Sequence, residues 1–289
     1  MPVEKYGLRL ALRDGYLNFY RHGQSVAKTW VNASDEPVSD IHVKYALGPW
    51  DAAEYSKLKR HYAHLKGNSV YHKETGKLAE YGGIETLRRW IEKADEHKGA
   101  EKTFVDDVVK HNSSIIDLEM GLPAWTEEKV APRMDMVALE AHADAVDIVF
   151  WEAKLIRNGE LVSRTAPKVI GQLEKYVEFL ADIKRRGHVV VAYRNTCCIL
   201  TELHKMAKLL HQQAGDGIRL PDLDILVKTA AKPDSDLQID CKPRLAIFDH
   251  NKSRSTNWAI HEKKLRDLGV PVRVFDDPPD SLRLQELAA

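Results

Sequence analysis

The apolar stretch VDIVFWEAKL constrains the fold of this chain more than any other segment. Because side chains alternate between the two faces of a strand, Phe150, Glu152 and Lys154 share one face. Trp151 and Ala153 point the opposite way, and both faces are largely apolar. The pattern predicts a strand buried on both sides, as at the centre of an α/β sheet. A buried carboxylate and ammonium are costly to desolvate unless they are paired or bound. Two explanations stay open, namely an ion pair at the strand end and a functional site.

Composition limits the classes of protein to which the chain can belong. Its 289 residues suffice for one large or two modest domains with real cores. Lys plus Arg and Asp plus Glu number 43 each, so no net field attracts polyanions, although a local basic patch stays open. No apolar run reaches the ~20 residues of a membrane span, and the N-terminus lacks a signal-peptide pattern. Three cysteines are too few for a disulfide framework or a four-cysteine cluster. We therefore expect a cytoplasmic protein with no membrane contact.

Residues 1–100 are predicted to form a β-rich accessory region. The segments YGLRLAL and YLNFYRHG flank Arg13-Asp14-Gly15, which is a hairpin turn signal. The segment QSVAKTWV predicts a third strand, and VSDIHVKYAL predicts a fourth. The accessory region is expected to recognise the substrate or a protein partner.

Two helical segments are predicted to follow these strands. The first covers residues 49–67 and ends at Gly67, and its basic side chains lie among aromatic ones. They form either a solvated helix face or a phosphate-contacting surface, with His61 and His64 at the surface. The second covers residues 83–99, and a domain boundary is expected near its end, at residue 100.

Residues 101–289 change to an alternation of strands and helices, which is typical of an α/β sandwich with a mixed sheet. The predicted elements are a helix at 101–112, strands at 113–122, 133–140 and 146–155, a helix at 167–186, a strand at 187–194, a helix at 195–213, a strand at 243–250, a helix at 259–269 and a strand at 270–275. The apolar stripe of the helix at 167–186 comprises Val169, Leu173, Tyr176, Leu180 and Ile183. Gly187 is expected to end that helix, and Asn195 or Thr196 to cap the next one.

Carboxylates are predicted to converge at one end of this sheet. Asp135 lies on the strand before Glu152, and the two strands are expected to pair as a hairpin. Glu119 ends the strand before those, on the predicted face of Asp117 and Ile115. Several carboxylates beside one lysine destabilise the chain unless a cation lies among them. Hard divalent cations prefer such oxygen ligands, and Mg²⁺ needs only one or two carboxylates plus substrate phosphate.

This pattern resembles the PD-(D/E)XK nuclease superfamily. The matching segments are Pro132-Arg133-Met134-Asp135 and Glu152-Ala153-Lys154, with the proline displaced from its usual place beside the aspartate. Gln172 and Tyr176 lie four positions apart on one face of the following helix, and Gln172 is expected to face the sheet rim. This pair resembles the Q-x-x-x-Y motif of the RecB-like and λ-exonuclease-like branch. The resemblance covers residues 101–195 and implies a restriction-endonuclease-like core, with a central mixed sheet flanked by helices.

The resemblance also implies roles for individual residues. Asp135 and Glu152 would bind Mg²⁺ or Mn²⁺, with the Ala153 carbonyl as a third ligand. Lys154 would contact the attacking water or the scissile phosphate, and Glu119 is an additional candidate ligand. Gln172 and Tyr176 would support the site from the helix. A further acid is expected on the helix before the sheet, and the candidates there are Glu101, Asp106 and Asp107.

A metal-dependent nuclease is the function that these features favour. Its expected reaction is hydrolysis of phosphodiester bonds, with DNA as the expected partner. The alternative is a nuclease-like core that has lost activity and serves as a nucleic-acid or protein adaptor, with residues 1–100 as a partner-binding region. A serine hydrolase of the α/β type is not supported, because the sequence contains no G-x-S-x-G nucleophile elbow.

Overall fold

A computed structural model of the chain describes residues 7–46, 61–122, 133–163, 166–215, 217, 219–249 and 257–276. Contacts between residues divide the chain into two units, Met1–Lys102 and Thr103–Ala289, so the division falls close to the expected boundary at residue 100. Each unit has its own sheet and its own core.

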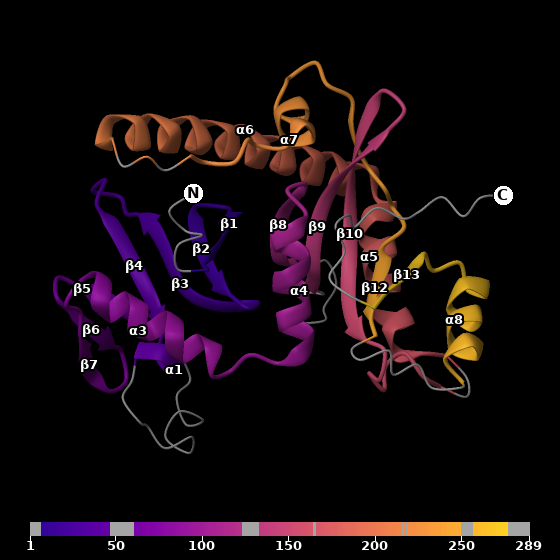
Figure 1. Cartoon of the computed structure of the whole chain (residues 1–289), viewed down its shortest axis with the longest axis horizontal. Coiled ribbons are helices and arrows are strands. Elements are labelled where there is room, and N and C mark those ends of the chain that lie inside the picture. The colour runs from indigo at the N-terminus through magenta and orange to yellow at the C-terminus, as the bar shows by residue number, and fades with distance from the viewer. Residues whose placement is uncertain are drawn as a thin grey trace. The chain divides into compact units, whose positions relative to one another are not determined.

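The first unit contains an antiparallel sheet of seven strands whose spatial order follows the sequence (Figure 1). Its strands are β1 Arg9–Arg13, β2 Tyr16–Arg21, β3 Gln24–Val31, β4 Pro37–His42, β5 Tyr62–Lys66, β6 Ser69–His72 and β7 Gly76–Glu80. Arg13 pairs with Tyr16, which leaves Asp14 and Gly15 as a two-residue turn. Gly15 has a φ of 76°, a conformation that glycine adopts without a Cβ clash. The predicted hairpin and third strand are confirmed.

The helix predicted over residues 49–67 is wrong in its second half. Tyr62–Lys66 is strand β5, which pairs with both β4 and β6, while residues 47–60 lie outside the described part of the chain. Within β5, Ala63 is buried and His64 is exposed, which is the alternation of a strand. Gly67, with a φ of 57°, turns the chain into β6 instead of ending a helix. The predicted fourth strand ends at His42, where the short helix α1 Val43–Ala46 begins.

The core of the first unit lies between one face of this sheet and helix α3, Ile84–Asp95, within the helix predicted at 83–99. Trp90, Ile91 and Ala94 of α3 are buried together with strand residues such as Ala27 and Ile41. Burial of this apolar stripe is what holds the helix on the sheet.

The second unit contains a mixed sheet of six strands, which confirms the predicted α/β class. Its strands are β8 Ile115–Gly121, β9 Arg133–His142, β10 Ala145–Leu155, β11 Leu237–Ile239, β12 Arg244–Phe248 and β13 Val272–Phe275. Their order is β13-β12-β10-β9-β8, and β11 pairs with the first part of β10. The pairs β8–β9 and β9–β10 are antiparallel, whereas β12 is parallel to both β10 and β13.

Helices cover both faces of this sheet. They are α4 Ala100–His111, α5 Lys168–Ala181, α6 Ile183–Ala214, α7 Ile225–Ala230 and α8 Trp258–Asp267. Helix α4 packs on the face of Trp151 and Ala153, and the other four pack on the face of Phe150. Strand β10 is therefore buried on both sides, as its sequence predicts.

The predicted strand at 187–194 is wrong, because α6 runs without interruption from Ile183 to Ala214 (Figure 1). Gly187 lies inside this helix. An added Cβ there would meet nothing within 4 Å, so no close contact requires glycine at this position, and the glycine does not mark a turn. Helix α5 ends earlier than predicted. Asp182, in an extended conformation, separates it from α6, and its Oδ1 accepts the N–H of Arg185 at 2.9 Å, so Asp182 caps α6 in place of Asn195 or Thr196. The predicted stripe therefore holds except at Ile183, which is 77% exposed.

Candidate active site

The candidate site begins where the β9–β10 ladder ends. The register of this pair runs from Ala145 opposite His142 to Trp151 opposite Met136. One step further, this register would set Asp135 opposite Glu152. There the N–H of Ala153 donates to Oδ2 of Asp135 at 2.7 Å. The Asp135 carboxylate thus occupies the end of the ladder, directly beside Glu152.

Glu152 and Lys154 form the ion pair that their shared face predicts. The Nζ atom of Lys154 donates to Oε1 of Glu152 at 2.6 Å, and both side chains are less than one-tenth exposed. The same Nζ lies 3.3 Å from Oε2 of Glu160, whose side chain is 40% exposed. A lysine held between two carboxylates satisfies the ion-pair explanation by itself. The surrounding charges are therefore what separates the two explanations.

Asp135 experiences the charge of its neighbours strongly. Burial, and then the negative charge of Glu152, raise the pKa of Asp135 well above its ordinary value. The charge of Glu119 acts in the same direction, whereas the Ala153 N–H and the Lys154 ammonium lower the pKa. We call Asp135, Glu152, Glu119 and Lys154 the acidic cluster. It sets three carboxylates beside one lysine, and Arg133 pairs with Glu119 at its edge.

Glu119 reaches the acidic cluster through an irregular part of β8. Its φ is 51°, in the left-handed region that non-glycine residues rarely adopt, and its Oε2 lies 3.2 Å from Nη1 of Arg133. The prediction that Ile115 and Asp117 share one face is wrong. A β-bulge between these two residues sends Ile115 toward the α4 side and Asp117 toward the hydroxyl of Tyr193, at 3.1 Å.

The two residues of the predicted helix motif differ in their positions. Tyr176 is buried, and its hydroxyl donates to the carbonyl of Met120 at 3.0 Å. Burial and the charges of Glu152 and Asp135 raise the pKa of Tyr176, so its ring lies near the acidic cluster. Gln172 has an exposed side chain, and no hydrogen bond joins it to the part of the chain that the structure describes. The expectation that Gln172 supports the site is therefore not met.

The candidate acids on α4 lie away from the acidic cluster. Asp106 and Asp107 both pair with Lys110, at 3.2 and 2.8 Å, and the helix packs on the face of the sheet that Trp151 shares with Ala153. The carboxylates whose charges act on Asp135 are Glu152 and Glu119, and neither these two acids nor Glu101 is among them.

Sequence reasoning missed Glu160. The residue follows the turn after β10, where the N–H of Glu160 donates to Oδ1 of Asn158 at 2.9 Å and the turn brings the carboxylate back to Lys154. The segment Arg157-Asn158-Gly159-Glu160 is a recognisable turn signal directly after the E-x-K segment. That turn signal was the one feature of the sequence that could have predicted the return of Glu160 toward Lys154.

The donor set of the acidic cluster suits a hard divalent cation. Asp135 and Glu152 supply carboxylate oxygens. Burial and the neighbouring carboxylates both disfavour the charged form of Asp135, and a bound cation would favour that form. Among the described residues, no three His, Cys, Asp or Glu side chains are already arranged to hold a metal ion. Two carboxylates suffice for Mg²⁺ when water and substrate phosphate complete its shell. Pro132 of the PD-like segment lies outside the described residues.

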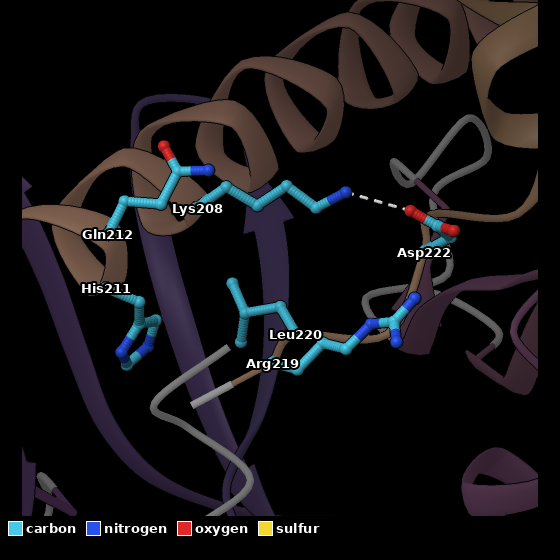
Figure 2. A pocket seen from close by; sticks show the side chains of 6 residues that line it. All are labelled: Lys208, His211, Gln212, Arg219, Leu220 and Asp222. Carbon is cyan, nitrogen blue, oxygen red and sulfur yellow. Dashed lines mark hydrogen bonds and ion pairs between the residues drawn. The ribbon is translucent and has the colours of Figure 1, made fainter. Parts of the chain in front are cut away.

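A pocket of about 230 Å³ lies elsewhere in the second unit (Figure 2). Its lining comprises Lys208, His211, Gln212, Arg219, Leu220 and Asp222. The Lys208 amine donates to Oδ1 of Asp222 at 2.8 Å, and this bond is the main cause of a lowered pKa of Asp222. The pocket contains none of the predicted site residues.

Comparisons of the chain with protein-family models, with curated proteins and with solved structures found no match. No helix in the described segments has the length and apolar character needed to cross a membrane.

Proposed function

We propose that the chain is a metal-dependent nuclease of the PD-(D/E)XK type that hydrolyses phosphodiester bonds, with DNA as its substrate. The observation that carries the proposal is the position of Asp135. Its carboxylate accepts the N–H of Ala153 at the end of the ladder, beside the Glu152–Lys154 pair, and its pKa is raised by burial and then by carboxylate charge. A strand-end ion pair alone explains Glu152 and Lys154, but it gives no reason for two further acids beside them.

The order of elements around the site also supports the proposal. Helix α4 precedes three antiparallel strands, α5 follows on the opposite face, and β12 returns parallel to β10. This is the helix–three-strand–helix–strand order expected of a restriction-endonuclease-like core. Support for the RecB-like branch is weaker, because it now rests on Tyr176 without Gln172.

The proposed roles follow from the chemistry of each group. Asp135 and Glu152 would hold Mg²⁺ or Mn²⁺, with the Ala153 carbonyl and Glu119 as further candidate ligands. A bound divalent cation would supply a water molecule of lowered pKa and would neutralise phosphate charge. The Lys154 ammonium would turn from Glu152 toward the substrate and stabilise the negative charge that develops on the phosphate. Tyr176 would hold β8 in place through its bond to Met120.

The inactive adaptor is the second candidate, and two observations favour it. Lys154 is held by two carboxylates, Glu152 and Glu160, and no hydrogen bond joins Gln172 to the residues that the structure describes. In an adaptor these contacts would be purely structural, and the core would bind nucleic acid or protein without cleaving it.

Cleavage assays distinguish the two candidates. Plasmid and single-stranded DNA would be incubated with the full chain in Mg²⁺, in Mn²⁺ and in chelator. Cleavage is expected with either metal and not with chelator. Lys154→Ala should lower the cleavage rate by ~10²–10³, equivalent to about 3–4 kcal/mol of transition-state stabilisation, because it removes a preorganised positive group.

The control for that variant is Lys205→Ala, which removes a lysine from the exposed surface of α6, paired only with Glu202 at 2.7 Å. It should cleave at the wild-type rate. A wild-type chain that is inert under every metal would favour the adaptor, and full activity in Lys154→Ala would place the chemistry elsewhere.

A further inference from the structure

The first unit has a sheet face with a composition unlike that of its core. Ala27, Ile41 and Ala63 point toward α3, so their strand neighbours point the opposite way. Cross-strand pairs align Lys28 with Asp40, Asp40 with His64, and His42 with Tyr62 on that second face. We call this side the aromatic–basic face, and its residues include Arg13, Tyr16, Tyr20, Lys28, Trp30, His42, Tyr62, His64 and Tyr71.

Cations and rings are in direct contact on the aromatic–basic face. The Lys28 Nζ atom lies 4.2 Å from the centroid of the Tyr62 ring and 5.5 Å from that of Tyr16. The Arg13 guanidinium carbon lies 5.9 Å from the centre of the Tyr20 ring. These are cation–π contacts, and they set positive charge beside flat apolar surfaces.

Hydroxyl bonds fix the orientation of two of these rings. The Tyr62 hydroxyl donates to Oγ of Ser25 at 2.7 Å, and Ser25 donates to Oδ1 of Asn18 at 2.6 Å. Nδ2 of Asn18 donates in turn to the hydroxyl of Tyr20 at 2.8 Å. The Tyr62 ring is thus pre-positioned, which lowers the entropic cost of stacking a ligand on it, whereas Tyr20 is buried and supports the face from below.

Positive charge accumulates at one end of the same face. Burial, and then the nearby positive charges of His61, Lys44, Lys28 and His97, together lower the pKa of His42 to about 4. Burial and the charge of Lys102 also lower the pKa of Lys44. Asp40 is an acid on this face, and its Oδ1 is engaged by Nδ1 of His64 at 2.9 Å. The field at this end therefore favours an anion.

We propose that the aromatic–basic face binds single-stranded nucleic acid. Lys28 would turn from the faces of Tyr62 and Tyr16 to a phosphate, bases would stack on the two rings that it uncovers, and Arg13 would hold a second phosphate. Rings on a sheet next to cations are the general means of holding unpaired bases, because every base has a stacking face and every nucleotide a phosphate. A duplex offers phosphates but hides the faces of its bases, so it would contact only the cations Lys28 and Arg13. The inference rests on the proposed function in that it names the surface for the substrate strand.

The test is binding of a labelled oligothymidine to the full chain, followed by fluorescence anisotropy in chelator over a range of salt concentrations. Lys28→Gln should weaken binding and reduce the slope of log affinity against log salt by about 0.7, as expected for the loss of one single-strand phosphate contact. Tyr62→Leu should raise the Kd about tenfold or more with the slope unchanged, because stacking involves no counterion release.

Two controls accompany these variants. Arg88→Gln removes one positive charge from α3, on the other side of the sheet, and should change neither the affinity nor the slope. Tyr62→Phe keeps the ring but loses the bond to Ser25, and it should bind within about threefold of wild type even if Tyr62→Leu unfolds the sheet.

The outcomes also separate this proposal from the nuclease proposal. Binding without cleavage would leave the face supported and overturn only the nuclease. Cleavage with no effect of Lys28→Gln or of Tyr62→Leu on binding would overturn the face alone. Tighter binding of a duplex than of the single strand would also overturn it.

Discussion

The acidic cluster gathers negative charges, and the aromatic–basic face gathers positive ones. At the acidic cluster, burial and neighbouring carboxylates raise the pKa of Asp135. At the aromatic–basic face, burial and neighbouring cations lower the pKa of His42 to about 4. Each group is pushed toward its neutral form, and each would be relieved by a ligand of the opposite charge. A chain with a net charge of zero can therefore carry two clusters of opposite charge, for which we propose a cation and an anion as ligands.

The largest effect should come from Asp135→Asn. The substitution keeps an oxygen that can accept the Ala153 N–H, but it removes a proposed metal ligand. Loss of a group that merely orients a metal ligand already costs ~10–100-fold in affinity or activity, so loss of the ligand itself should lower metal-dependent cleavage at least ~100-fold. The rate of DNA cleavage against Mg²⁺ concentration measures this effect. A rate within threefold of wild type would contradict a metal at Asp135.

The same variant tests the charge imbalance without any substrate. A carboxyl group whose pKa is raised in the folded state binds its proton more tightly there than in the unfolded chain. Its contribution to stability is therefore fully present below the unfolded pKa of ~3.9 and is lost as pH rises through the raised folded value. In chelator, Asp135→Asn should be more stable than wild type at pH ~7, and the difference should shrink in acid. Urea unfolding at both pH values measures the difference in stability between the two proteins. The same difference at both pH values would contradict the raised pKa of Asp135.

The aromatic–basic face predicts the opposite dependence on pH. His42 has a lowered folded pKa, so its contribution to stability is present above the unfolded value of ~6.5 and is lost as pH falls toward about 4. A shift of this size corresponds to at most about 3 kcal/mol. His42→Gln should remove this loss, because the Gln oxygen can accept the Lys44 N–H that Nδ1 of His42 accepts at 3.3 Å. Parallel stability curves for the two proteins between pH 7 and ~4 would count against the prediction.

The acidic cluster was more accessible to sequence reasoning than the aromatic–basic face. The apolar residues on both faces identify β10 as a buried strand. Once the preceding strand pairs with it as a hairpin, the register alone sets Asp135 beside Glu152. The aromatic–basic face depends on β5, where the mixture of aromatic and basic residues predicts a helix. Tyr62 and His64 acquire their neighbours only once β4 and β5 pair. A residue's partners across a sheet follow from register, and register over long separations is not encoded in any local pattern.

Two other failures have different physical causes. The run of valines before Tyr193 has high strand propensity, yet α6 continues through it because Tyr193 and Cys197 lie four positions apart on its buried side. Glu160 joins Lys154 because a turn folds back, and a turn signal gives no side-chain direction. Propensity was overridden by packing in the first case, and loop geometry was undetermined in the second.

The smallest expected effects come from the two residues of the helix motif, and they decide how far the resemblance to the RecB-like branch extends. Tyr176→Phe leaves the Met120 carbonyl buried without its hydroxyl donor, so the free energy of unfolding should fall by about 1–2 kcal/mol. Gln172→Ala removes an exposed side chain that has no hydrogen bond within the described residues, so stability should change by less than ~0.5 kcal/mol. Chemical denaturation measures both values, and cleavage assays on the same proteins should show a modest loss for Tyr176→Phe and less than a threefold change for Gln172→Ala. A tenfold or greater loss of cleavage in Gln172→Ala at unchanged stability would mean that Gln172 contacts the substrate directly. In that event its exposure would reflect an open substrate channel, and the full motif would belong to the site.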